Sequence, residues 1–157
     1  MNIEIKKLET IDAGDLEKIS TWMYDWWGKA EGYTFEVMKC YMENSVQKDR
    51  FPYTYGLFLD DKLIGMYQIR LDDLFVRPDL YPWLANVYID VAYRNNGYAR
   101  LIMESIKANA QKCREFKELY LYTVHKGLYE KYGWEYICEI DTFLTNDRIQ
   151  RLYKLDL

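Results

Sequence analysis

The chain has 157 residues, half of them hydrophobic, which is typical of one folded globular domain. Its net charge of −4 at pH 7 gives it no basic face and argues against nucleic acid as a general partner. No apolar run approaches the roughly 18 residues of a membrane span, and the first seven residues are too charged for a secretory signal. We therefore expect a soluble cytoplasmic protein with no membrane partner.

The three cysteines, Cys40, Cys113 and Cys138, are odd in number and lack C-x-x-C spacing. This pattern indicates neither a disulfide framework nor a zinc ribbon. The single histidine, His125, has no second ligand of the kind that an H-E-x-x-H motif supplies. We expect reduced, mostly buried thiols and no bound metal.

The first half of the chain predicts two helices and three strands. Residues 2–8 alternate as a strand, and Asp12 is a typical N-cap for the helix after it. The apolar face of that helix recurs at helical spacing and consists of Leu16, Ile19, Met23, Trp26 and Trp27. A second helix is predicted over about 35–47, and an Asp-rich turn joins strands over about 53–59 and 63–71 into a hairpin.

The second half predicts a strand–helix–strand unit. A loop rich in Asp and Pro leads to a strand over 83–91, an amphipathic helix over 98–113 and a strand over 119–123. A short helix and two strands complete the chain, over 126–132, 135–140 and 150–156. Because such crossovers are right-handed and join parallel strands, the sequence predicts a mixed α/β fold.

The hexapeptide Arg94-Asn95-Asn96-Gly97-Tyr98-Ala99 lies between the predicted strand and the amphipathic helix. A strand-to-helix turn leaves backbone N–H groups without partners, and the helix dipole adds partial positive charge there. Gly97 permits the close approach of a ligand, and Ala99 keeps the first helical turn thin. The motif predicts either a pyrophosphate-binding loop or an ordinary turn.

Three segments, in the right order and spacing, resemble the GNAT superfamily of acyl-CoA-dependent N-acetyltransferases. Residues 89–99, IDVAYRNNGYA, resemble the end of the family's fourth strand and its Q/R-x-x-G-x-G/A pyrophosphate loop. The strand LYLYT follows at 119–123, and residues 127–134, GLYEKYGW, resemble the family's short helix beside the cofactor sulfur. The resemblance extends over essentially the whole chain and implies a single GNAT domain over residues 1–157.

That resemblance implies a mixed α/β sheet of roughly six or seven strands with about four helices, in which the fourth and fifth strands splay apart. Acetyl-CoA would be the cosubstrate, with its pantetheine pairing along the fourth strand and its thioester carbonyl near the N–H groups of Ile89 and Val91. The pyrophosphate would contact Arg94, Asn95, Asn96, Gly97, Tyr98, Ala99 and Arg100.

Acetyl transfer from a thioester to an amine needs a proton for the departing thiolate, and Tyr129 is the candidate donor. A phenol with a pKa of about 10 stays protonated at neutral pH and lies within a few units of a thiol at about 8.5. The position of Tyr129 in GLYEKYGW distinguishes it from the other tyrosines, for which packing is the usual role.

The residue that accepts the amine proton has several candidates. GNAT relatives place a Glu or a pair of His on the fourth strand, but the matching residues here are Trp83 and Ala85, which cannot accept a proton. Asp72, Asp73, Asp90 and ordered water are the alternatives. We favour Asp73 as a carboxylate that orients the amine, with Asp72 and Trp83 in the substrate site.

Four large aromatic residues, Trp22, Tyr24, Trp26 and Trp27, fall within six positions and exceed what one helix face can bury. In the GNAT fold this region covers the acceptor cleft, so we expect Trp26 in the core and Trp22 or Trp27 facing the cleft. Aromatic walls beside acidic residues suit a cationic amine.

These features predict direct transfer of an acetyl group to a primary amine of a small molecule or peptide in a ternary complex, since no cysteine is placed for a covalent intermediate. One alternative is a GNAT-fold module that binds acyl-CoA, as a sensor or partner, without efficient transfer. The other is a plain α/β interaction domain. Pairing between two copies of the last strand at the sheet edge would form a homodimer, and the sequence does not decide whether this occurs.

Overall fold

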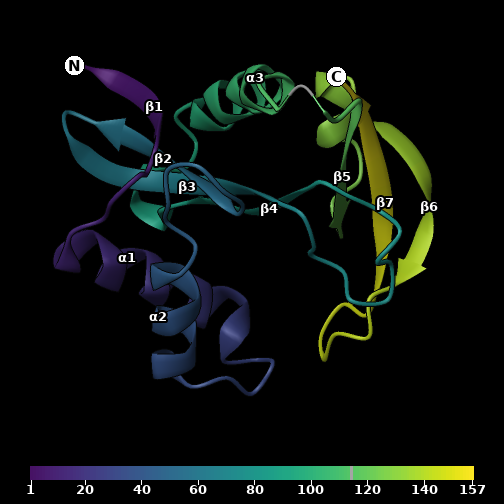
Figure 1. The fold of residues 1–157 in the computed structure, drawn as a ribbon, viewed down its shortest axis with the longest axis horizontal. Coiled ribbons are helices and arrows are strands. Elements are labelled where there is room, and N and C mark those ends of the chain that lie inside the picture. The colour runs from purple at the N-terminus through teal and green to yellow at the C-terminus, as the bar shows by residue number, and fades with distance from the viewer. Residues whose placement is uncertain (114) are drawn as a thin grey trace.

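The computed structural model describes residues 1–113 and 115–157, and its centre is a seven-stranded sheet in the order β1-β2-β3-β4-β5-β7-β6 (Figure 1). The strands are β1 Ile3–Lys7, β2 Tyr53–Leu59, β3 Lys62–Arg70, β4 Trp83–Ile89, β5 Glu118–Thr123, β6 Glu135–Asp141 and β7 Ile149–Asp156. Neighbouring strands run antiparallel except β4 and β5, which are parallel. The mixed α/β fold with its central parallel pair is thus confirmed.

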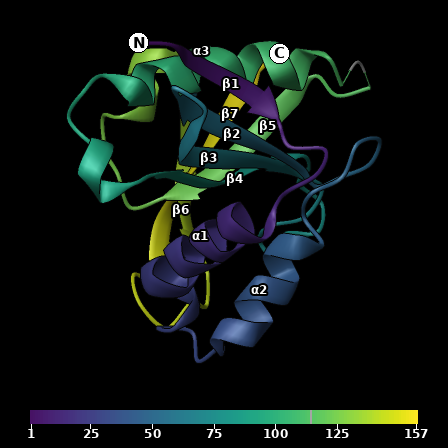
Figure 2. The same ribbon diagram turned by 90° about the vertical axis from the view of Figure 1, so that its left-hand side faces the viewer.

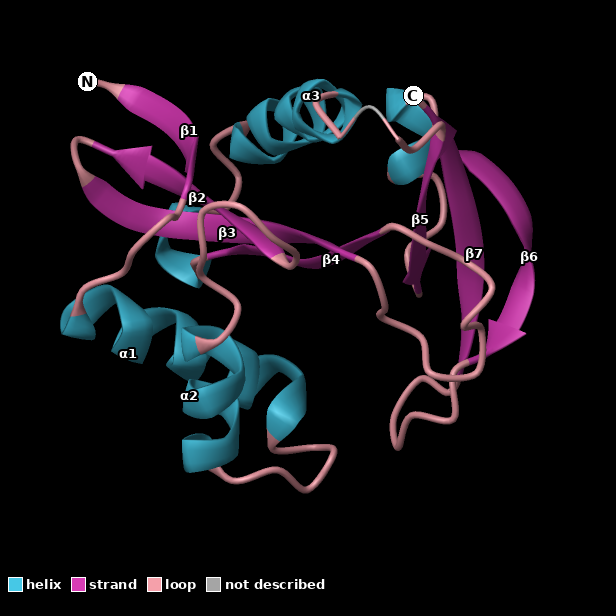
Figure 3. Ribbon diagram, in the orientation of Figure 1, coloured by secondary structure: helices cyan, strands magenta, loops and turns pink. Residues whose placement is uncertain are grey.

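The described residues form three α-helices, α1 Ala13–Met23, α2 Phe35–Glu43 and α3 Tyr98–Gln111 (Figure 3). A π-helix follows α1 over Tyr24–Gly28, and 3-10 turns cover Val91–Tyr93 and Tyr129–Tyr132. Helices α1 and α2 cover one face of the sheet and α3 covers the other (Figure 2). None of the helices in the described ranges has the length and apolar character to cross a membrane.

Each face of the sheet has its own core. Ile102 and Ile106 of α3 are fully buried in one cluster, while Ile19 of α1 and Met38 of α2 are buried in the other. Strands β2 and β3 are therefore covered on both sides and are almost continuously buried. Burial on both faces explains their uninterrupted apolar sequence.

Local sequence signals set most element boundaries. The Asp12 side chain accepts a hydrogen bond from the Asp15 N–H at 2.8 Å, as expected of an N-cap. Asp60 and Asp61 have φ values of 47° and 66°, the left-handed pair that a two-residue hairpin turn requires.

Several element boundaries differ from the expectation by one or more residues. Helix α2 ends at Glu43, and the short helix is a 3-10 turn that begins only at Tyr129. Strand β4 ends at Ile89 because the Asp90 side chain accepts from the Ala92 N–H at 3.0 Å and starts a 3-10 turn. Asp90 therefore caps this turn, so its carboxylate has a local structural role.

The thiols are free, but the expectation that they are mostly buried is wrong. Cys40 and Cys138 are exposed, while Cys113 is half-buried. Cys40 lies on the outward side of α2, and Cys138 lies on β6, a strand at the edge of the sheet. An amphipathic helix and an edge strand each leave one side to solvent, and these two thiols occupy it.

Candidate active site

Strands β4 and β5 separate after a single point of pairing. Trp83 lies opposite Tyr120, and the Tyr120 N–H donates to the Pro82 carbonyl at 3.0 Å. Beyond this point β4 runs across the view in Figure 1 while β5 turns away from it. A bulge in the β3–β4 pairing, where Asn86 has a φ of 52°, accompanies the separation.

The separation leaves one edge of β4 open near Ile89. The Asp90 N–H donates to the Ile64 carbonyl of β3 at 2.9 Å. Since neighbouring residues of a strand direct their backbone groups to opposite edges, the N–H and carbonyl of Ile89 point toward β5. The Arg94 Nε donates to this carbonyl at 2.8 Å, and its guanidinium lies 5.1 Å from the Tyr88 ring centroid. The Arg94 side chain therefore occupies one of the two lone pairs of this carbonyl at the open edge.

The predicted loop forms an uncapped helix start. Gly97 is the N-cap of α3 with a φ of 80°, and no side chain caps this end. In the part of the chain that the structure describes, the backbone N–H groups of Asn95, Asn96 and Gly97 donate to no protein acceptor. The Asn96 side chain braces the turn by donating to the carbonyls of Tyr93 and Arg94, each at 3.0 Å. Free amides at a helix start suit a phosphate group.

The backbone N–H groups in the first turn of α3 are not all free to bind an anion. Tyr98 and Ala99 occupy the first helical positions, whose N–H groups have no intrahelical acceptor. The Arg100 N–H, in contrast, donates to the Gly97 carbonyl at 3.2 Å, and its side chain pairs with Glu104 at 2.7 Å. No atom lies within 4 Å of a Cβ built on Gly97, so the space over the loop is open. The loop therefore fits the pyrophosphate of acetyl-CoA.

Tyr129 is buried with a hydroxyl that makes no hydrogen bond among the described residues. Its ring is 7% exposed and packs edge-on against Trp134 at a centroid distance of 6.0 Å. Burial raises the pKa of Tyr129 to about 12. The phenol is thus protonated at neutral pH and its proton is not committed to a protein partner.

The 3-10 turn that carries Tyr129 is anchored to β7 by a cluster absent from the sequence predictions. The Tyr153 hydroxyl donates to Glu130 Oε1 at 2.5 Å, and the Arg151 Nε donates to the same hydroxyl at 2.8 Å. The Tyr153 hydrogen bond holds the pKa of the Glu130 carboxyl below its usual range. A single turn of helix is thereby fixed to the sheet directly beside Tyr129.

Asp73 follows β3 and lies beside β5. Its backbone carbonyl accepts from the Tyr122 hydroxyl at 3.4 Å, and the Tyr122 ring lies 5.9 Å from that of Trp83. Burial raises the pKa of the Asp73 carboxyl to about 7, even though the positive charge of Arg70 lowers it. The carboxylate can therefore exchange a proton near neutral pH.

The predicted acid and base lie on opposite faces of the sheet. Tyr129 belongs to the core on the α3 face, together with Leu121 of β5. Tyr122 points the other way because successive strand residues alternate, and Asp73 lies next to its hydroxyl. The opening between β4 and β5 lies between these two faces.

A buried polar network on β3 and β4 was missed by sequence reasoning. Gln68 is fully buried, and its Oε1 accepts from Asn86 Nδ2 at 2.8 Å and from Arg70 Nη1 at 3.0 Å. Asn86 Nδ2 also donates to the Tyr41 hydroxyl at 3.2 Å. Trp27 Nε1 donates to Asn86 Oδ1 at 3.2 Å. The sequence signal for this network was one polar residue within each of two largely apolar strands, Gln68 in β3 and Asn86 in β4.

The aromatic residues after α1 are placed differently from the expectation. Trp22 is buried, with 7% exposed, whereas Trp26 is 49% exposed, so the placement of Trp26 in the core is wrong. The wider π-helix over Tyr24–Gly28 shifts the phase of the side chains and rotates Trp26 outward. Both residues expected at the cleft contact β4: the Trp22 ring lies 5.2 Å from that of Tyr88, and Trp27 donates to Asn86.

Trp83, which was expected in the substrate site, lies inside the protein. Its side chain is fully buried, and its Nε1 donates to the Leu80 carbonyl at 2.7 Å. The indole closes the narrow end of the opening, where β4 and β5 meet. Asp72 is exposed, and its backbone carbonyl accepts from Arg70 Nε at 3.3 Å. The role of Asp72 toward a substrate stays a prediction.

A contact between distant loops spans the side of the molecule below the sheet in Figure 1. Glu31, in the α1–α2 loop, accepts from the Thr145 N–H at 2.8 Å and from its hydroxyl at 3.0 Å. Thr145 lies in the loop between β6 and β7. Residues 114 positions apart therefore join the helical layer to the far end of the sheet.

Comparisons with known proteins give a consistent result. Residues 16–134 match the model of the acetyltransferase (GNAT) family, while a search of curated proteins finds no match. A GNAT acetyltransferase from Streptococcus pneumoniae is 19% identical, with 99% of each chain covered and a TM-score of 0.69. A GNAT acetyltransferase from Elizabethkingia anophelis, solved with acetyl-CoA bound, is 16% identical over 99% of each chain, with a TM-score of 0.65.

An acetyl transferase from Salmonella typhimurium is a third similar structure. Its identity is 8%, its TM-score is 0.73, and 100% of this chain and 96% of that chain are covered. That protein modifies the N-terminal serine of ribosomal protein L7/L12. At such low identity, the three structural likenesses show a shared fold.

Proposed function

We propose that this chain, which belongs to the GNAT acetyltransferase family, transfers the acetyl group of acetyl-CoA to a primary amine in a ternary complex. The observation that carries the proposal is the open edge of β4, which leads directly into the free amides at the start of α3. Acetyl-CoA would supply an activated thioester. The protein would supply the binding surface and the two proton-transfer groups.

The backbone at the end of β4 and the start of α3 would bind the cosubstrate. The amides of Asn95, Asn96 and Gly97 would hold the pyrophosphate, assisted by the dipole of α3. The N–H groups of Ile89 and Val91 would polarise the thioester carbonyl, since preorganised donors stabilise the charge that develops on its oxygen. Few side chains are needed for this half of the site.

Asp73 and Tyr129 would move the protons. Asp73, with a pKa of about 7, would accept the proton that the amine releases as the new N–C bond forms. Tyr129 would give its proton to the sulfur as the C–S bond breaks. The pKa of Asp73 makes it suitable as a general base, a stronger role than the orienting one expected from the sequence.

We favour a small-molecule amine over a peptide as the acceptor. The contact between Glu31 and Thr145 joins the two loops that flank this side of the sheet, which restricts the approach of a long chain. The similar protein from Salmonella typhimurium, which modifies an N-terminal serine, keeps a peptide acceptor as the alternative.

The test is acetylation of a panel of small primary amines and short peptides, with the acetylated product detected by mass spectrometry. Direct detection is needed because the free thiols Cys40 and Cys138 are exposed and would react with thiol-trapping reagents. Product formation from any amine supports the proposal. Binding of acetyl-CoA with no product from the panel would favour a sensor or partner module instead.

A further inference from the structure

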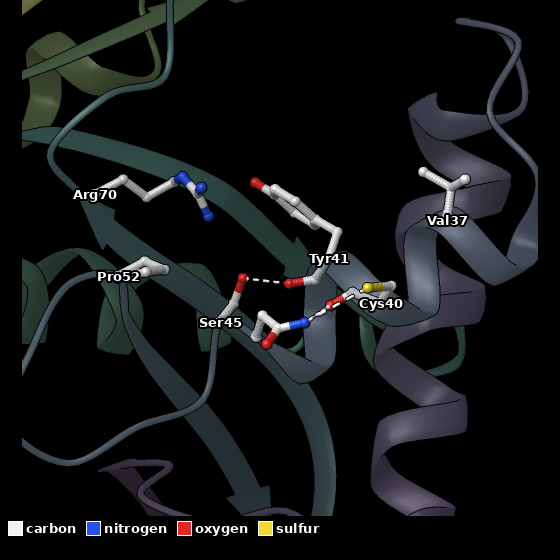
Figure 4. A pocket seen from close by; sticks show the side chains of 7 residues that line it. Val37, Cys40, Tyr41, Ser45, Pro52 and Arg70 are labelled. Carbon is white, nitrogen blue, oxygen red and sulfur yellow. Dashed lines mark hydrogen bonds between the residues drawn. The ribbon is translucent and has the colours of Figure 1, made fainter.

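A pocket of about 350 Å³ lies between α2 and the end of β3, outside the groups assigned to acetyl transfer above. Its lining consists of Val37, Cys40, Tyr41, Asn44, Ser45, Pro52 and Arg70 (Figure 4). Arg70 is the one charged residue in this lining, and Figure 4 shows its guanidinium and the Tyr41 ring directed toward one another. The pocket thus combines a cation with an aromatic and aliphatic wall.

Arg70 is held in place by neutral groups. Its Nη1 donates to Gln68 Oε1 at 3.0 Å, and its Nε donates to the backbone carbonyl of Asp72 at 3.3 Å. Its guanidinium carbon lies 4.7 Å from the Tyr41 ring centroid. Over residues 1–113 and 115–157, no carboxylate oxygen lies within the 4.0 Å of an ion pair with this side chain. Arg70 is therefore a fixed, half-buried cation whose Nη2 makes no hydrogen bond to a described residue.

The position of Gln68 explains why Arg70 is fixed. Gln68 is fully buried, and its Nε2 donates to Thr54 Oγ1 at 3.0 Å, whose hydroxyl donates in turn to the Ser45 carbonyl at 2.6 Å. This chain of bonds leaves Gln68 Oε1 facing Arg70. A guanidinium held in this way is preorganised for a planar, two-oxygen anion.

Tyr41 connects the pocket to the reaction site. Its hydroxyl accepts from Asn86 Nδ2 at 3.2 Å, and Asn86 lies on the stretch of β4 that has separated from β5. In the antiparallel pairing of β3 and β4, Arg70 lies opposite Trp83, the residue at the narrow end of the opening. A molecule that places its amine near Asp73 can therefore place a second group on the Arg70 side of Tyr41.

We propose that this pocket binds a carboxylate of the acceptor, so that the acceptor class is small amines that also carry a carboxylate. This proposal rests on the acetyltransferase function proposed above and specifies its substrate class. The carboxylate would bind the free Nη2 side of Arg70, and the carbon chain would lie against Tyr41 and Pro52.

The test compares ω-amino acids from glycine to 6-aminohexanoate, each with its own carboxamide, as acceptors. For the best chain length, we expect the wild-type protein to prefer the carboxylate by about 10- to 100-fold in kcat/KM. Arg70→Gln should remove that preference while leaving acetyl-CoA binding unchanged, and Arg70→Lys should keep part of it. Arg77→Gln is the matched control, because Arg77 is paired with Asp79 at 2.7 Å on the following loop.

A binding measurement separates this proposal from the function on which it rests. Calorimetry with the N-acetylated products in the presence of CoA should show tighter binding of the carboxylate form, and Arg70→Gln should abolish the difference. Equal use and equal binding of the two forms, or a preference that survives in Arg70→Gln, would overturn the carboxylate proposal. Failure of acetyl-CoA itself to bind would overturn the transferase function first.

Discussion

The two halves of the proposed site use different chemical groups, backbone groups in one and side chains in the other. The proposed cosubstrate half consists of backbone groups at the end of β4 and the start of α3, held by Gly97 and by the Asn96 side chain. The proposed acceptor half consists of side chains from β3, β4, α2 and the π-helix, joined through Gln68 and Asn86. A backbone site depends on a local turn, whereas a side-chain site depends on the meeting of distant segments.

This difference has a consequence for variation. Substitutions in the cosubstrate half matter mainly where they add bulk or change the turn, because the donors are amides. Substitutions in the acceptor half change the chemistry presented to the amine. Four variants test the side chains, each paired with a control residue nearby, and a glycine substitution tests the backbone half.

The largest effect is expected for Tyr129→Phe. Loss of a positioned proton donor should lower kcat by about 10²- to 10⁴-fold, while acetyl-CoA binding stays unchanged. Tyr132→Phe, in the same 3-10 turn, should retain activity. Steady-state kinetics at saturating acetyl-CoA measures both variants, and an unchanged kcat in Tyr129→Phe would remove this residue from the mechanism.

The next effect concerns pH. Burial raises the pKa of Asp73 to about 7, so kcat/KM of the wild-type protein should rise as pH increases through this value and the carboxylate forms. Asp73→Asn should lower kcat/KM at pH 8 by about 10²-fold and abolish this rise. Asp72→Asn changes an exposed neighbour and should keep the profile. A rise near pH 7 that persists in Asp73→Asn with the same amine would assign the titration to another group.

A smaller effect is expected for Trp27→Ala. Its indole donates to Asn86 and packs edge-on against Tyr41 at 5.9 Å, so its loss should raise KM for the amine by about tenfold. The affinity for acetyl-CoA should not change. Trp26→Ala is the control, because Trp26 is 49% exposed and packs against Tyr88, whereas Trp27 bonds to Asn86. Equal effects of the two substitutions on the amine KM would count against an acceptor role for Trp27.

The smallest effect is expected for Glu31→Gln. The charge-assisted contact with Thr145 is exposed, so its weakening should raise KM for the amine by only about threefold. Glu36→Gln, at the start of α2, serves as the control. If the loops instead exclude bulky acceptors, the ratio of peptide to small-amine acetylation should rise in Glu31→Gln, and an unchanged ratio would argue against that exclusion.

The sequence predicted the parts of the molecule that depend on local rules. The N-cap at Asp12, the hairpin turn at Asp60 and Asp61, and helix α3 with its loop at Gly97 all lie as expected. Each of these features is set by residues a few positions apart. A short motif is therefore sufficient to predict the turn and helix start on which the proposed cosubstrate half depends.

The acceptor half could not be predicted in the same way. Continued α-helical spacing places Trp26 in the core, but the π-helix rotates it to the surface. Burial of Trp83 depends on Tyr120 and Tyr122 of β5, which lie far from it in the sequence. The environment of Arg70 likewise depends on the packing of α2 against the sheet, which periodicity does not specify.

The most direct test of the account is calorimetric titration of acetyl-CoA into the wild-type protein, Gly97→Trp and Gly32→Trp. Gly97 and Gly32 have φ values of 80° and 84°, and neither has an atom within 4 Å of a built Cβ, so the two substitutions impose similar backbone strain. We predict saturable binding to the wild-type protein and to Gly32→Trp, and its loss in Gly97→Trp. Absence of binding to the folded wild-type protein, or undiminished binding to Gly97→Trp, would contradict the assigned cosubstrate site.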